Sequence, residues 1–169
     1  MKNLLIVALL FVIFSANAQE TEKKSKKELK AEKKAKQIEE VKAIVESKNF
    51  VFDARTANPM KGRTVTLTSD YDVKVTNDSI FSYLPYYGVA YSASYGGTDS
   101  PMIFDVPFET CTQEKVKNGY MVKVDAKNSN DRLTFTFHIS ETGTTSLSVS
   151  SINRQSITYY GEILKEKKK

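Results

Sequence analysis

The chain has 169 residues, with 25 Lys and Arg against 20 Asp and Glu, a formal net charge of +5, and 40% hydrophobic residues. It holds one Cys, one His and no Trp. This length suits a single domain, and the counts exclude a disulfide framework, a cysteine-based zinc site and any chemistry that needs two imidazoles.

The N-terminus is typical of an export signal. Lys2 precedes an uncharged apolar run over residues 4–14, and small residues follow up to Ala18. Such a run is too short to span a bilayer, and its basic start and small-residue end are those of a secretory signal peptide. We therefore predict a signal peptide at residues 1–18, cleavage after Ala18, and a periplasmic or secreted mature protein without a transmembrane segment.

Residues 19–49 form a charged segment that predicts a helix. The segment carries 10 Lys and 7 Glu with no Pro or Gly, and Lys, Glu and Ala are strong helix formers. Ile38, Val41, Ile44 and Val45 lie on one helical face. We expect these last turns to dock on the domain and the earlier turns to serve as a charged spacer.

The positive charge is concentrated at the two ends of the chain. A basic tail at residues 165–169 has 4 Lys and 1 Glu, whereas residues 50–164 have 10 Lys and Arg against 12 Asp and Glu. A nucleic-acid-binding domain would carry a basic stripe on its folded body. The distribution therefore argues against a nucleic-acid partner.

Residues 50–164 predict one antiparallel β domain, because short alternating or β-branched runs are broken by turn residues. The expected strands, about ten in number, are Phe50–Ala54, Thr64–Thr68, Tyr71–Thr76, Ser79–Tyr83, Val89–Tyr95, Met102–Val106, Phe108–Val116, Tyr120–Ala126, Arg132–Ser140, Thr144–Ser150 and Ser156–Leu164. Asn118-Gly119 is the strongest hairpin signal. Within Arg132–Ser140, the alternation directs His138 outward and its apolar neighbours inward.

The absence of strand–helix–strand alternation after residue 49 argues against a parallel α/β sheet. A closed barrel of consecutive hairpins removes the sheet edges, whereas a two-sheet sandwich would only protect them. We therefore expect a mainly β protein, an antiparallel β-barrel with an N-terminal charged helix that covers one end or lies along the wall.

One segment is unusually rich in tyrosine. Five of the nine tyrosines lie within residues 83–97, at Tyr83, Tyr86, Tyr87, Tyr91 and Tyr95. A Tyr ring combines a stacking face with a hydroxyl, so the cluster suits a small amphipathic ligand at the mouth of a barrel. Alternatively, Tyr83, Tyr91 and Tyr95 are wall residues of a strand, where aromatic residues are favoured.

A second candidate segment begins at Arg154 and contains Tyr159 in the final strand. Arg154 could hold a carboxylate or phosphate through two parallel hydrogen bonds. It could equally bond loop carbonyls or close the barrel end by packing over a Tyr ring. The predicted ligand-binding residues are Tyr83, Tyr86, Tyr87, Tyr91, Tyr95, Arg154 and Tyr159.

No motif predicts catalysis, a metal or a cofactor. His138 is the only imidazole and has no local partner motif, and Asp70 with Asp72 lacks the Gly and Glu of an EF-hand loop. We therefore predict a non-enzymatic binding protein. Two alternatives stay open: a hydrolase that joins an Asp or Glu to His138, and a cell-envelope interaction module whose Lys-rich ends contact an envelope protein or an acidic surface.

Five motifs together resemble a known family. They are Phe50-Val51-Phe52-Asp53-Ala54, Asn58-Pro59-Met60-Lys61-Gly62, Leu67-Thr68-Ser69-Asp70-Tyr71, Leu84-Pro85-Tyr86-Tyr87-Gly88-Val89-Ala90-Tyr91 and Asn153-Arg154-Gln155-Ser156-Ile157-Thr158-Tyr159-Tyr160-Gly161. Over about residues 38–163, the chain resembles a family of exported domains of unknown function from the Bacteroidota. The resemblance implies a lipocalin-like β-barrel in the periplasm or at the surface of a Gram-negative cell, and it implies no activity. The chain departs from the family at Val89, where Arg is more frequent.

Overall fold

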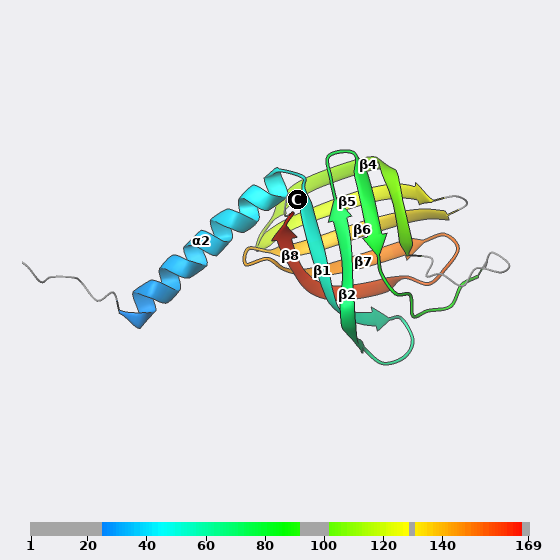
Figure 1. The fold of residues 1–169 in the computed structure, drawn as a ribbon, viewed down its shortest axis with the longest axis horizontal. Helices are drawn as coiled ribbons and strands as arrows, with labels where there is room; N and C mark the ends of the chain where they lie inside the picture. The colour runs from blue at the N-terminus through cyan, green and yellow to red at the C-terminus, as the bar shows by residue number, and fades with distance from the viewer. Residues whose placement is uncertain (1–24, 92–101, 129–130, 167–169) are drawn as a thin grey trace, which may run out of the picture. The chain divides into compact units, whose positions relative to one another are not determined.

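The computed structural model describes residues 25–91, 102–128 and 131–166 (Figure 1). The predicted signal peptide, Tyr95 and the last three residues of the basic tail lie outside these ranges. No helix in the described part of the chain is long and apolar enough to cross a membrane.

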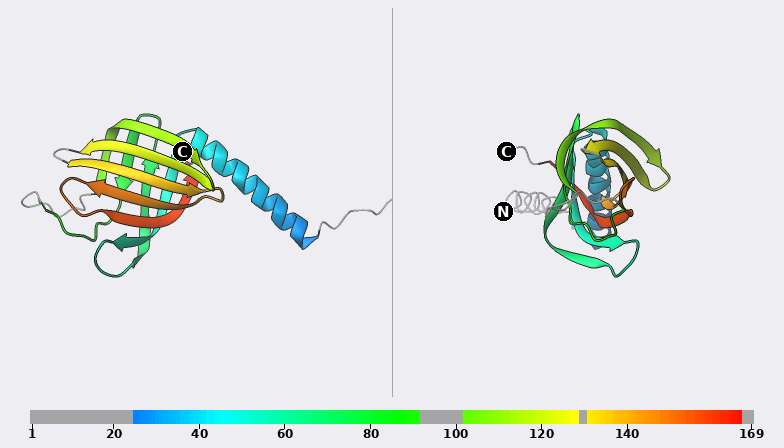
Figure 2. Two further views of the ribbon diagram at one scale, coloured as in Figure 1. Left: turned by 180° about the vertical axis from the view of Figure 1, so that it is seen from behind. Right: turned by 90° about the vertical axis from the view of Figure 1, so that its right-hand side faces the viewer.

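Eight antiparallel strands close into a barrel, in which each strand pairs with the next and β1 pairs with β8. The strands are β1 (Phe50–Pro59), β2 (Val65–Val75), β3 (Ser79–Tyr83), β4 (Ile103–Val116), β5 (Gly119–Asn128), β6 (Asp131–Ser140), β7 (Thr144–Ser151) and β8 (Ile157–Lys165). Figure 2 shows them wrapped around a common axis. The prediction of a mainly β, antiparallel barrel with one N-terminal helix is confirmed.

The number of strands is eight and not about ten. Two pairs of expected strands are each one continuous strand, because β2 runs through Ser69-Asp70 and β4 runs through Pro107. Pro107 lies at the last rung of the β3–β4 ladder, where a missing backbone donor costs little. Of the expected strand Val89–Tyr95, the described residues contribute only an isolated bridge between Ala90 and Arg154.

Large apolar side chains line the barrel interior. Phe137 of β6 packs edge-on against two rings of β1, with centroid distances of 5.3 Å to Phe50 and 6.0 Å to Phe52. The alternation predicted for β6 is confirmed, since its apolar residues are buried and His138 is exposed. The largest fully buried side chains are Tyr159, Phe50, Phe52, Phe135, Phe137, Ile80, Leu84, Met102, Leu133, Leu147, Ile157 and Val45. Filling by side chains is usual for a barrel of eight strands.

Helix α2 spans Lys26–Glu46 and begins at a capping box. The N–H of Ser25 donates to Oε2 of Glu28 at 2.8 Å, and the N–H of Glu28 donates to Oγ of Ser25 at 3.3 Å. These two bonds satisfy backbone donors that the first helical turn leaves without partners. The chain divides into two compact units, Met1–Lys33 and Lys34–Lys169.

The last turns of α2 dock on the β domain, as predicted, and the structure shows that they contact the turn between β6 and β7. Val41 and Val45 are buried, and Nε2 of Gln37 donates to the carbonyl of Thr142 at 2.7 Å. Gly143 has a φ of +88°, and a Cβ added there would lie 3.2 Å from Cγ2 of Val41. A glycine therefore permits both the left-handed turn and the close approach of the helix.

The barrel has two ends with different roles. The turns after β2, β4 and β6 lie at the end where α2 docks, here called the helix end. The connections after β1, β3, β5 and β7 lie at the opposite end, here called the loop end. Two described segments meet there: residues 84–91, here called the tyrosine segment, and residues 152–156, here called the arginine loop.

Candidate functional site at the loop end of the barrel

Hydrogen bonds fasten the tyrosine segment to the arginine loop. The N–H of Tyr91 donates to the carbonyl of Asn153 at 2.7 Å, and the N–H of Gln155 donates to the carbonyl of Val89 at 3.0 Å. The hydroxyl of Tyr86 lies 2.9 Å from the carbonyl oxygen of Gln155 and 3.1 Å from that of Val89. Two segments more than 60 residues apart in sequence thus form one surface.

A largely buried ion pair anchors the arginine loop to β6. Nε of Arg154 lies 3.1 Å from Oδ2 of Asp131, and the two side chains are only 13% and 10% exposed. Oγ of Ser151 lies 2.7 and 2.8 Å from the two carboxylate oxygens of Asp131. The pairing compensates two charges that would be costly to bury alone.

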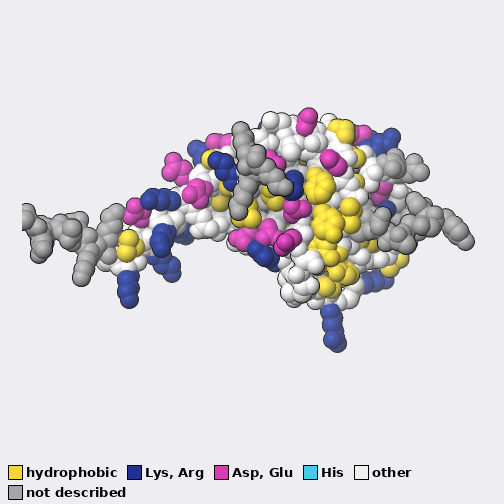
Figure 3. Space-filling view, viewed as in Figure 1, with side chains coloured by type: hydrophobic (Ala, Val, Ile, Leu, Met, Phe, Trp, Pro, Cys, Tyr) yellow, Lys and Arg dark blue, Asp and Glu magenta, His cyan; other side chains and the backbone are white. Residues whose placement is uncertain are grey.

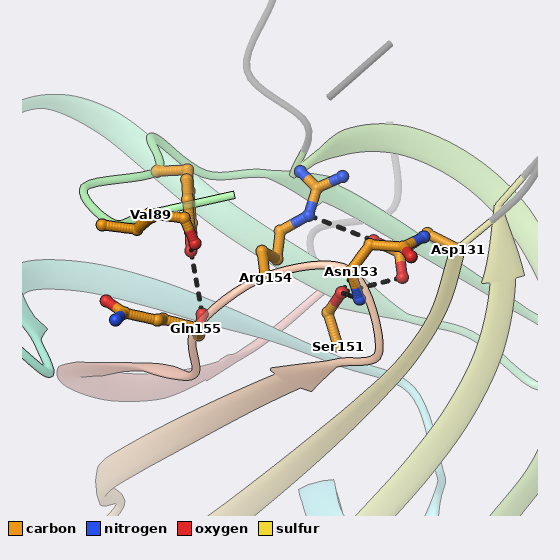
Figure 4. Close-up of polar contacts among 7 residues, drawn as sticks. Val89, Asp131, Ser151, Asn153, Arg154 and Gln155 are labelled. Carbon is orange, nitrogen blue, oxygen red and sulfur yellow. Dashed lines mark hydrogen bonds and ion pairs between the residues drawn. The ribbon is translucent and has the colours of Figure 1, made fainter. Parts of the chain in front are cut away.

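The ring of Tyr86 packs against the Arg154 guanidinium. Its Cζ atom lies 5.7 Å from the ring centroid of Tyr86, a distance at which the ring face attracts a cation. The shortest contact of the ion pair is made by Nε, and the two Nη atoms form the other edge of the guanidinium (Figure 4). Among the residues that the structure describes, no hydrogen bond is found from the Arg154 side chain, and its buried Nε is without one. This contact matches the structural alternative predicted for Arg154, in which the side chain packs over a Tyr ring.

Three of the predicted tyrosines lie on the tyrosine segment near Arg154. Tyr86 is half-buried, and its burial raises the pKa of its hydroxyl, an effect that the charge of Arg154 opposes. Tyr87 and Tyr91 are exposed, at 37% and 69%. The structure thus brings Tyr86 and Arg154 into contact and exposes the rings of Tyr87 and Tyr91 on the same segment as Tyr86.

The other predicted tyrosines lie elsewhere. Tyr83 ends β3 and is 41% exposed, and its ring stacks on Tyr71 with a centroid distance of 5.5 Å. Tyr159 lies fully buried in the core, where its hydroxyl donates to the carbonyl of Pro85 at 2.7 Å. Tyr159 therefore binds the tyrosine segment from the core side, and its side chain is not accessible to a ligand. Tyr95 lies outside the described residues.

Exposed hydrophobic side chains gather at the loop end. Two of them, Val89 and Ile152, belong to the tyrosine segment and the arginine loop and are 54% and 69% exposed. The exposed hydrophobic residues of the described loop-end connections are Met60, Tyr87, Val89, Tyr91 and Ile152. Figure 3 shows a further band of hydrophobic side chains over the face that carries β2. Grouped apolar side chains of this kind often mark a binding surface.

The sequence did not point to three residues of this end: Asp131, Ser151 and Ile152. Asp131 meets Arg154 across a separation of 23 residues, and Ser151 meets Asp131 across 20. Neither spacing matches a local motif, because the barrel register alone brings these residues together. Ile152 is the one residue of the three with a local signal, since it is an apolar residue in a polar loop. Single exposed apolar residues are common on protein surfaces, so this signal is weak.

His138 lies in a different place, on the outer wall. It lines an open groove of about 350 Å³ together with Ser146 and Tyr160. Within the described part of the chain, the lining of this groove includes no Asp or Glu. The carboxylate that the hydrolase alternative needs beside His138 is therefore missing from the groove.

The single thiol is unremarkable. Cys111 of β4 is half-buried, and its burial raises the pKa of the thiol. A raised pKa lowers the fraction of thiolate and with it the reactivity. Among the described residues, no group of three or more His, Cys, Asp or Glu side chains is arranged to hold a metal ion.

Fold and site together define a closed eight-stranded antiparallel barrel, covered by a helix at one end and carrying a tyrosine and arginine cluster at the other. The chain belongs to the DUF4251 family, a domain of unknown function, which matches residues 32–163. The expected resemblance to a domain-of-unknown-function family with a barrel fold is confirmed to this extent.

A solved structure supports the fold assignment. The crystal structure of a DUF4251 family protein from Bacteroides eggerthii is similar, with a TM-score of 0.57 and 16% sequence identity. The likeness covers 78% of this chain and 89% of that one. At this identity it concerns the fold alone. No curated protein matches the chain.

Proposed function

We propose that this protein is an exported, non-enzymatic binding protein that holds a small amphipathic molecule at the loop end of its barrel. The observation that carries the proposal is the group of exposed apolar side chains on the tyrosine segment, which is hydrogen-bonded to the loop that carries the Arg154 guanidinium. Apolar surface is provided by Tyr87, Val89 and Tyr91. Hydrogen-bond donors are provided by the guanidinium of Arg154, which packs on Tyr86 of the same segment. This combination of apolar lining and few placed polar groups is that of small-molecule sites.

The proposal places the ligand at the mouth and not inside the barrel. A ligand in the interior, as in a lipocalin, would have to displace large buried side chains such as Phe50, Phe137 and Tyr159. Interiors of this kind are close-packed, so such displacement would be costly. The export part of the proposal is supported by the basic start, the apolar run and the small residues up to Ala18.

Native mass spectrometry of the protein purified gently from its own host tests both parts. A measured mass that corresponds to a chain beginning at Gln19 supports export. A mass that includes residues 1–18 contradicts it. A reproducible bound mass that disappears on denaturation supports the binding role. A bare protein contradicts it.

Matched variants locate the binding. We expect Tyr91→Ser to lower the bound fraction at least several-fold. Tyr160→Ser serves as the control, because it removes a ring of similar exposure, 48%, from the outer wall of β8. Equal loss in both variants would contradict a site at the loop end.

A second candidate function, a cell-envelope interaction module, is favoured by one observation. Every Lys of α2 from Lys26 to Lys34 is exposed, and such a group of positive charges attracts an acidic partner. Deletion of residues 19–33 spares Gln37, Val41 and Val45, which dock the helix. If this candidate is right, the deletion removes envelope proteins recovered with the wild type, whereas unchanged recovery rejects it.

A further inference from the structure

We propose that the polar end of the bound molecule is an oxyanion, a carboxylate or a phosphate, and that the two Nη atoms of Arg154 hold it. The inference rests on the proposed function and names the class of ligand for the same site.

The first support is that the ion pair with Asp131 does not occupy all the nitrogen atoms of the Arg154 guanidinium. The shortest contact with Asp131 is made by Nε, at 3.1 Å, and it balances the charge, although Nε makes no hydrogen bond with a described residue. The outer edge of the guanidinium is formed by the two Nη atoms (Figure 4). Among the described residues, no acceptor binds this edge, so a ligand can bind it. That edge presents two parallel N–H groups at the spacing of two oxygens on one carboxylate or phosphate.

The second support is the rigidity of the guanidinium. Asp131 is itself fixed through both of its oxygens by Oγ of Ser151, and the ring of Tyr86 lies at 5.7 Å from Cζ of Arg154. A guanidinium held on one edge and one face loses little conformational entropy when a ligand binds the other edge. The site is thus organised before an anion arrives.

The third support is burial. The Arg154 side chain is only 13% exposed, so an ion pair with a ligand there is screened less by water and salt than one on an open surface. The exposed rings of Tyr87 and Tyr91 stand on the same segment as Tyr86. They supply apolar contact for the remainder of an anionic amphipathic molecule.

The test compares four probes that share one twelve-carbon chain and differ in their head group: dodecanoate, dodecyl phosphate, dodecanol and dodecyltrimethylammonium. Affinities of the signal-cleaved protein are measured below the micelle concentration by titration calorimetry. We expect dodecanoate or dodecyl phosphate to bind at least tenfold more tightly than dodecanol, and the ammonium probe to bind most weakly. The two anionic arms tell a carboxylate from a phosphate ligand.

The outcomes separate the two proposals. Equal binding of all four probes overturns the oxyanion inference and leaves the loop end as an amphipathic site. Binding of none overturns the proposed function and the inference together. This comparison uses the wild type alone, so it does not depend on whether a variant folds.

Variants then assign the anion to Arg154. In Arg154→Gln we expect at least a tenfold loss of affinity for the anionic probe and little change for dodecanol. Arg63→Gln is the charge-matched control, since Arg63 is exposed in a different connection at the loop end. Where Arg154→Gln does not fold, the double variant Arg154→Gln with Asp131→Asn removes both buried charges. Unchanged anion affinity in a folded variant overturns the inference.

Discussion

The hydroxyl of Tyr159 in β8 donates a hydrogen bond to the carbonyl of Pro85, 74 residues earlier, at 2.7 Å. Tyr159 is fully buried, whereas Pro85 is half-buried and lies two residues before the exposed stretch from Tyr87 to Tyr91. The bond joins the core of the barrel to the surface that we propose binds a ligand. The position of that surface is therefore set by the core.

We expect Tyr159→Phe to lower the free energy of unfolding by about 1–2 kcal/mol, because it leaves the Pro85 carbonyl without its donor. Urea denaturation followed by circular dichroism measures the change. Tyr160→Phe is the control, since Tyr160 is 48% exposed, and it should change stability by less than about 0.5 kcal/mol. Equal effects of the two substitutions would show that the buried hydrogen bond contributes nothing.

Stability should fall at alkaline pH. Burial holds the pKa of the Tyr159 hydroxyl well above its usual value of 10.0. The unfolded chain therefore releases this proton more readily than the folded chain, so the contribution of Tyr159 is complete below pH 10 and declines as the pH rises above it. Urea titrations at pH 8 to 11 should show a steeper decline for the wild type than for Tyr159→Phe. Parallel profiles would contradict the assignment.

The ion pair at the loop end should matter far more than one on the wall. Asp131→Asn leaves the Arg154 guanidinium buried without its counter-charge, and we expect a loss of about 3 kcal/mol. The control is Glu109→Gln, because Glu109 pairs with Arg132 at 3.1 Å on an exposed site, where a pair contributes less than about 1 kcal/mol.

A double-mutant cycle separates the Asp131 effect from a general weakening of β6. Asp131→Asn combined with Arg154→Gln should cost less than the sum of the two single variants, because the double variant buries no unpaired charge. Additive costs would contradict a direct interaction between these two side chains.

Docking of α2 should depend on its last turns. Val45 is fully buried, and we expect Val45→Ala to lower the free energy of unfolding by about 2 kcal/mol through lost burial and a residual cavity. Leu29→Ala in the same helix removes a side chain that is 45% exposed and should have little effect. Thermal unfolding of the two variants makes the comparison, and similar midpoints would argue against docking through Val45.

Much of the fold could be predicted because it follows from local pattern. The alternation of β6 predicts that Phe135 and Phe137 face inward and His138 outward, and the structure agrees. The spacing of Val41 and Val45 predicts the docked face of the helix. The predicted number of strands was wrong because residues typical of turns lie inside the long strands β2 and β4. The partners of a strand decide whether a residue such as Pro107 ends it, and these partners are distant in sequence.

The candidate site could be predicted only in part. The concentration of tyrosines and Arg154 pointed to the loop end, and the contact of Arg154 with Tyr86 shows that two of these residues meet. Asp131 and Ser151 were missed because the barrel register brings them to Arg154. Tyr159 belongs to the core, since the phase of β8 turns it inward.

The sequence by itself determined the class of fold, because hydrophobic alternation and helix propensity depend on neighbouring residues. Only the tertiary structure decided which end carries the candidate site and how Arg154 is held. Those features depend on closure of the barrel between β1 and β8 and on the register of each strand pair. Contacts of this kind join residues that are far apart along the chain, so no local pattern records them.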